Sequence, residues 1–76
     1  MSMYRTSSLP LAAAISLNFP LEGVDRSNPR VEFIFKREEG LDRLIQFYYQ
    51  DNLQVSPLRF YNELKFLKSI LYGGKA

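Results

Sequence analysis

The segment from Val55 to Tyr72 has the longest periodic pattern of the chain, and its period predicts a helix. At about 100° per residue, one face of this helix is apolar and is predicted to join the core: Phe60, Leu64, Leu67 and Leu71. A second face, the basic-aromatic stripe, combines tyrosines and lysines: Tyr61, Lys65, Lys68 and Tyr72. A third face carries two more apolar residues beside two charged ones: Phe66, Ile70, Arg59 and Glu63. A helix on a single sheet needs one apolar face, so the other two are candidate contact surfaces.

This segment also carries its own start and stop signals. Ser56 can cap the helix, because its hydroxyl can accept a hydrogen bond from an unpaired backbone N–H of the first turn. Pro57 then occupies the first helical position, where its missing N–H costs nothing. Val55 and Phe60 have the spacing of a hydrophobic staple, and the two glycines at 73–74 are typical of a helix end.

The N-terminal part predicts a short strand followed by a buried helix. Met3 to Thr6 fits the strand, and Ser7 or Ser8 can cap the helix that follows. Apolar residues cover nearly its whole circumference: Leu11, Ala12, Ala13, Ala14, Ile15 and Leu17. Such a helix is buried on more than one side, and Pro20 ends it after Asn18.

The middle of the chain predicts a β-hairpin. Residues 21–26 and 30–36 flank a turn-forming Ser-Asn-Pro cluster. The second strand alternates cleanly, with one apolar face: Val31, Phe33 and Phe35. Gly23 interrupts the first strand, which favours a bulge or an edge position there.

A second helix follows the hairpin. Glu38, Glu39 and Asp42 lie at its start, where negative charge is favourable, and residues 51–52 end it. Its inner face is apolar: Leu41, Leu44, Ile45 and Tyr48.

These elements predict an α+β fold in the order β-α-β-β-α-α, with a small antiparallel sheet of two or three strands packed with helices. No repeat, linker or low-complexity run divides the chain, so residues 1–76 are expected to form a single domain. The expected core combines the hairpin and the last two helices: Val31, Phe33, Phe35, Leu44, Tyr48, Phe60, Leu64, Leu67 and Leu71.

Composition argues against an enzyme. The 76 residues include no Cys and no His, so the usual nucleophile–base pairs, zinc ligands and disulfides are missing. Ser69 near Lys65 and Lys68 is ordinary for an exposed helix face, and the acidic residues before the second helix suit a helix start better than a calcium or magnesium site. We expect no catalytic residue, no bound metal and no cofactor.

Residues 9–17 resemble the apolar part of a signal peptide, but the basic head is thin and a buried helix explains them better. No apolar run reaches the roughly 18 residues of a membrane span. We therefore expect no membrane partner and a cytoplasmic location, with which the missing cysteines agree.

The net charge of +2 and the pI of about 9.1 permit nucleic-acid binding without requiring it. The basic-aromatic stripe is the best candidate, because lysines neutralise phosphates and aromatic rings stack on unpaired bases. Arg30 and Lys36 of the hairpin are predicted to add to this site, although Asp25 and Glu32 dilute the charge there. The alternative is a solvated helix face on which lysine stems cover half-buried tyrosines.

Phe66 and Ile70 suggest a second function, which is protein–protein interaction. A core of this size rarely contributes more than about 3–5 kcal/mol, and oligomerisation is a common remedy where disulfides and metals are missing. We therefore expect a homodimer or another protein partner at these residues. The alternative is that both side chains pack against the second helix near Phe47.

Three motifs carry a resemblance to a known family: RVEFIF at 30–35, LIQFYY at 44–49 and VSPLRFYNELKFLKSILY at 55–72. They resemble a family of small uncharacterised proteins of microbes and their mobile elements, labelled a domain of unknown function. The first half of the chain is similar only in its apolar helix after a short strand. The resemblance implies a compact α+β fold and a mobile-element context, and it implies no chemistry.

Overall fold

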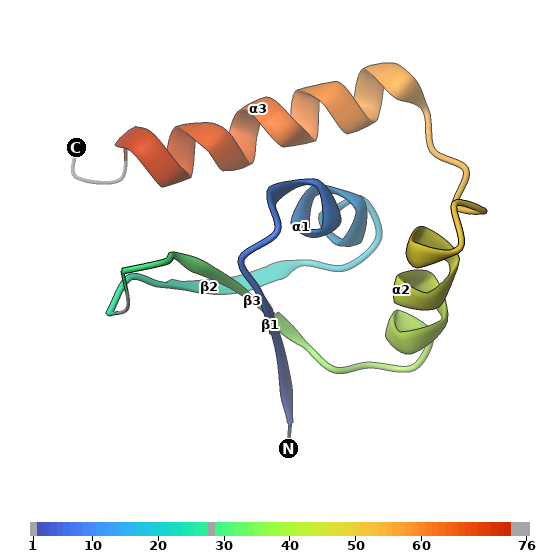
Figure 1. The fold of residues 1–76 in the computed structure, drawn as a ribbon, viewed down its shortest axis with the longest axis horizontal. Helices are drawn as coiled ribbons and strands as arrows, with labels where there is room; N and C mark the ends of the chain where they lie inside the picture. The colour runs from blue at the N-terminus through green and yellow to red at the C-terminus, as the bar shows by residue number, and fades with distance from the viewer. Residues whose placement is uncertain (1, 28, 74–76) are drawn as a thin grey trace.

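The computed structural model describes residues 2–27 and 29–73 and confirms the predicted α+β fold. Its elements follow the predicted order: β1 (Met3–Thr6), α1 (Leu9–Ser16), β2 (Leu21–Asp25), β3 (Glu32–Lys36), α2 (Leu41–Tyr49) and α3 (Pro57–Gly73). Figure 1 shows α1 at the centre, with the sheet below it, α2 to its right and α3 across the top.

The three strands form one antiparallel sheet in the order β1-β3-β2. Tyr4 and Thr6 of β1 pair with Phe35 and Phe33 of β3, so these alternate residues share the face that α1 covers. The β2–β3 pairing shifts register between Leu21 and Gly23, which confirms both the bulge and the edge position predicted for β2.

Helix α1 is enclosed by the other elements. Residues 11–15 are at most 1% exposed, and the three alanines among them allow its neighbours to approach closely. Ser8 caps the helix, its hydroxyl accepting a hydrogen bond from the Leu11 N–H at 3.3 Å. The prediction that this helix is buried on more than one side is therefore confirmed.

Helix α3 packs mainly along α1, so that α1 separates it from the sheet (Figure 1). Of the predicted core, four residues are buried: Phe33, Phe35, Leu44 and Leu67. The other five are half-buried: Val31, Tyr48, Phe60, Leu64 and Leu71. The predicted core combines the hairpin directly with α3, whereas α3 packs mainly on the single short helix α1, which buries a narrower stripe of its surface.

Helix α2 covers the remaining side of α1. Its inner face is confirmed, because Leu41 and Leu44 are buried in the core. Gly40 precedes its first turn with φ 93°, a left-handed conformation that strongly favours glycine. Asp42 lies in that first turn and accepts a hydrogen bond from Arg37 at 2.6 Å. In the part of the chain that the structure describes, no helix has the length and apolarity needed to cross a membrane.

Candidate nucleic-acid interface

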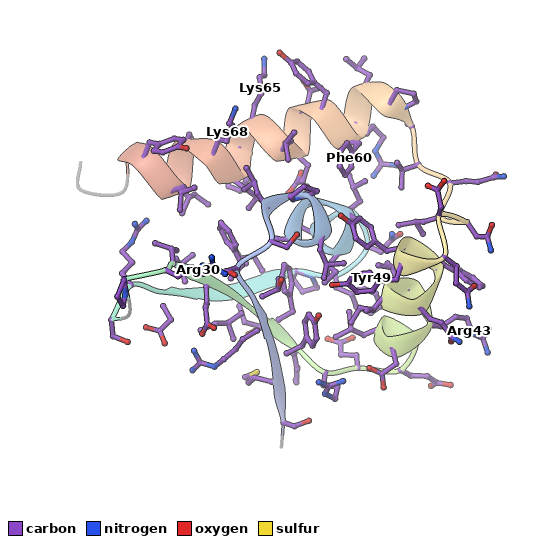
Figure 2. All side chains as sticks on the ribbon, viewed as in Figure 1. Arg30, Arg43, Tyr49, Phe60, Lys65 and Lys68 are labelled. Carbon is purple, nitrogen blue, oxygen red and sulfur yellow. The ribbon has the colours of Figure 1, made fainter. Side chains whose placement is uncertain are left out.

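The outer face of α3 turns away from α1, and all of its large side chains are exposed: Leu58, Tyr61, Lys65, Phe66, Lys68 and Tyr72. Tyr61 and Tyr72 are 55% and 74% exposed, so they do not form a half-buried border of the core. Figure 2 shows Lys65 and Lys68 on the side of α3 that points away from the body of the molecule. The four residues of the basic-aromatic stripe therefore share one accessible surface.

The acidic residue of α3 contacts α1, whereas its basic residues are exposed to solvent. Its sequence contains one acidic residue, Glu63, whose carboxylate accepts a hydrogen bond from the hydroxyl of Ser16 on α1 at 2.8 Å. Three basic residues point to solvent: Arg59, Lys65 and Lys68. Among the described residues, this carboxylate therefore faces α1 and forms no ion pair with the outward lysines.

Lys65 has a local partner on the outer face. Its ammonium nitrogen lies 5.0 Å from the centre of the Tyr61 ring, which is a cation–π contact between side chains four positions apart. Among residues 2–27 and 29–73, no ion pair involves Lys65 or Lys68. Both ammonium groups are therefore available to an anionic ligand.

The basic residues nearer the sheet are mostly occupied. Arg5 pairs with Asp25 at 2.7 Å and with Glu32 at 3.3 Å. Hydrogen bonds from the hydroxyl and backbone N–H of Ser27, and then the one from Arg5, lower the pKa of Asp25 to about 2. Arg26 donates to the Ile70 carbonyl and thereby ties the hairpin to the last turn of α3. These two arginines are therefore engaged in contacts within the fold.

Arg30 and Lys36 are exposed but lie away from the stripe. Arg30 precedes β3 and Lys36 is its last residue, so about 20 Å of extended chain separates them. Figure 2 places Arg30 at the level of the sheet, below α3 and its outward lysines. The structure therefore brings together four of the six predicted contact residues and leaves these two apart.

The two residues predicted to form a protein interface, Phe66 and Ile70, differ in their exposure to solvent. Ile70 is half-buried and packs against the core, whereas Phe66 is 54% exposed. Leu58, which is 68% exposed, adds apolar surface to the same helix. Sequence reasoning missed Leu58 and the Ser16–Glu63 contact, because both depend on how α3 lies across α1.

The remaining polar candidates have structural roles. Ser69 donates its hydroxyl hydrogen to the Phe66 carbonyl at 2.7 Å, within its own helix. Within the described residues, no three acidic side chains come together as a metal-binding group.

The family model described as "Domain of unknown function (DUF5659)" matches residues 1–73. No curated protein and no solved structure matches the chain.

Proposed function

Because the chain belongs to the family described as a domain of unknown function (DUF5659), whose description names no activity, we propose a function from the geometry of α3. The protein is a non-catalytic binding module that holds single-stranded nucleic acid on the basic-aromatic stripe. One observation carries this proposal: the only carboxylate of α3 points inward to Ser16, while Lys65 and Lys68 point outward beside exposed tyrosines. The expected mobile-element context agrees with such a module.

The stripe has the two components that single-stranded binding needs. Lysines neutralise phosphates and release counterions, and tyrosine rings offer flat surfaces on which unpaired bases stack. Tyr61 and Tyr72 are eleven positions apart, or about 16 Å along the helix. This length suits a contact with a few nucleotides and no strong sequence preference.

Binding must displace Lys65 from the ring of Tyr61. An exposed cation–π contact contributes about 0.5–1 kcal/mol, whereas stacking a base on an aromatic ring contributes about 1–3 kcal/mol. The freed ammonium group also gains a phosphate partner. The exchange therefore favours the bound state.

The test compares two double variants of equal net charge. Replacing Lys65 and Lys68 by alanine should reduce the slope of log affinity against log salt by roughly two, since each lost phosphate contact removes about one unit. Replacing Lys36 and Arg43, which are exposed elsewhere, should leave the slope nearly unchanged. Fluorescence anisotropy with a labelled single-stranded oligonucleotide measures both. No binding at low salt, or an equal loss in both variants, contradicts the proposal.

Tyr61→Ala tests the stacking component separately. It should weaken single-stranded binding by about 1–3 kcal/mol and leave duplex binding unchanged, because duplex bases are already stacked. The thermal midpoint should hardly move, since this ring is exposed.

A second candidate is a homodimer formed through the apolar part of the same face. The exposed side chains of Leu58 and Phe66 support it, because burying them would add to a small core. Sedimentation at high micromolar concentration should then show twice the 8.9 kDa monomer mass, and Phe66→Ser should restore the monomer. A wild-type monomer under these conditions rejects the dimer and leaves the nucleic-acid proposal intact.

A further inference from the structure

A cavity of about 380 Å³ lies where α1, α2 and the start of α3 meet. Its walls come from both ends of the connection between α2 and α3 and from the helices beside it: Ala14, Tyr48, Tyr49, Asp51, Leu53, Val55 and Phe60. The volume is within the range of roughly 300–1,000 Å³ that is usual for small-molecule sites. The cavity lies on the inner side of α3 and is distinct from the basic-aromatic stripe.

Three aromatic rings contribute to its walls. Tyr48 and Tyr49 lie at the end of α2, with ring centres 5.2 Å apart and ring planes at 86° to each other. Phe60 comes from the first turns of α3, and Figure 2 shows Phe60 and Tyr49 on the two helices that border this region. The two tyrosines are in edge-to-face contact, so the edge of one ring covers part of the face of the other. Ring faces carry negative electrostatic potential, and the faces that this contact leaves open, together with Phe60, can attract a cation.

Asp51 is the charged residue among these lining residues, and its backbone is in an unusual conformation. Its φ of 60° is left-handed, where glycine is strongly preferred at the end of a helix. Two hydrogen bonds hold it there, from the Asp51 N–H to the Tyr48 carbonyl at 3.1 Å and from the Asn52 N–H to the Phe47 carbonyl at 2.9 Å. The chain therefore has an acidic residue in the lining of the cavity, at a position that glycine would fill with less strain.

We propose that this cavity binds a methylated ammonium group, of the kind present in choline or in trimethyl-lysine. The rings attract the charge without hydrogen bonds, the methyl groups contact Leu53 and Val55, and the Asp51 carboxylate supplies the counter-charge. An anion would be repelled by Asp51. A neutral apolar ligand would desolvate this carboxylate without compensation.

A neighbouring cavity of about 320 Å³ provides an internal comparison. It shares Leu53 with the first cavity, but its charged lining residue is Arg43, and it has two aromatic rings, Phe19 and Phe47. The two hollows thus differ in the sign of their charge. Arg43→Gln is therefore a matched control, because it changes one exposed charge beside the same connection.

The test titrates isotope-labelled protein with choline and with the neutral analogue of choline in which carbon replaces the nitrogen. Choline should give saturable NMR shifts centred on Tyr49 and Asp51, and the neutral analogue should bind at least about tenfold more weakly. A short peptide containing trimethyl-lysine, compared with the unmodified peptide, shows whether the group is recognised on a small molecule, on a side chain or on both. Equal binding of choline and its neutral analogue, or no saturable shift with either choline or the methylated peptide, overturns the proposal.

Three variants complete the test. Asp51→Asn should weaken choline binding by about tenfold, because asparagine tolerates the left-handed conformation but carries no charge. Asp51→Gly should raise the thermal midpoint and still lose choline affinity, so its loss cannot be due to unfolding. Arg43→Gln should bind choline as the wild type does. Unchanged affinity in both Asp51 variants, or an equal loss in Arg43→Gln, contradicts the site.

Discussion

Helices α1 and α3 lie against each other, yet they differ in nearly every property. The shorter α1 has 8 residues, of which five in succession are buried and none is charged. The longer α3 has 17 residues, and four of them are charged. Burial is described for residues 57–72 of this helix, and among these Leu67 alone is fully buried. The shorter helix therefore holds the core together, while much of the longer one has no role in packing.

This difference separates the residues that stabilise the fold from those that are free to bind. Side chains of α1 contact the sheet, α2 and α3, so their shape is constrained by packing. The outer face of α3 contacts solvent, and large aromatic rings there contribute little to stability. We therefore expect substitutions in α1 to affect folding and substitutions on the outer face of α3 to affect binding.

The largest effect is expected from a substitution in the centre of α1. Leu11→Ala should lower the free energy of unfolding by about 2–5 kcal/mol, because it leaves a cavity among residues that cannot close around it. Phe66→Ala on the outer face of α3 should change it by less than about 0.5 kcal/mol. Urea unfolding measures both, and similar midpoints for the two variants would remove the distinction between the helices.

An intermediate effect is expected at the polar contact between the two helices. Ser16→Ala removes the hydroxyl that donates to Glu63 at 2.8 Å, and it should cost about 1.5 kcal/mol because the carboxylate remains half-buried without this partner. Glu63→Gln keeps an acceptor for Ser16 and should cost less. The same urea experiment ranks them, and a larger loss for Glu63→Gln would show that the carboxylate charge has another partner.

A smaller effect is expected at the start of α3. The Arg59 N–H lies 3.5 Å from the Ser56 hydroxyl oxygen, which is long for a hydrogen bond. Ser56→Ala should therefore cost about 0.5 kcal/mol, at the low end of the range for helix caps. A loss above about 1.5 kcal/mol would mean that the cap is much stronger than this distance indicates.

The smallest effect concerns Asp25, whose carboxylate accepts hydrogen bonds from Ser27 and from Arg5, and it depends on pH. Folding lowers the pKa of Asp25 from 3.8 to about 2, so the ionised form stabilises the folded state above the higher value. This contribution is lost as the pH falls through about 2. The difference in thermal midpoint between the wild type and Asp25→Asn should therefore be present near neutral pH and shrink between about pH 4 and pH 2. A difference that does not change with pH contradicts this assignment.

Sequence reasoning predicted the elements well because their signals are local. Ser8 and Pro57 mark helix starts, and the alternation of Phe33 and Phe35 identifies the buried face of β3. It could not predict that α3 lies on α1, because the apolar stripe of α3 would fit either a sheet or a helix. The sequence pattern therefore predicts Ile70 at an interface, whereas in the structure it packs against the core.

The two candidate sites also differ in whether local sequence signals are enough to predict them. The basic-aromatic stripe was predictable, since helical spacing alone places Tyr61, Lys65 and Lys68 on one side. The aromatic cavity was not, because Tyr49, Asp51 and Phe60 come from separate elements and meet only through the path of the connection between α2 and α3.

The most direct test of the proposed function is an NMR titration of the labelled protein with a short single-stranded oligonucleotide at low salt. We predict that shifts concentrate at the outward positions of α3, around Tyr61, Lys65 and Lys68, while the amides of residues 11–15 in α1 stay unmoved. The shifts should reverse when salt is added, because the contact depends on phosphate neutralisation. No shifts at high oligonucleotide concentration, or shifts centred on the sheet near Lys36, would contradict the assignment of α3 as the binding surface.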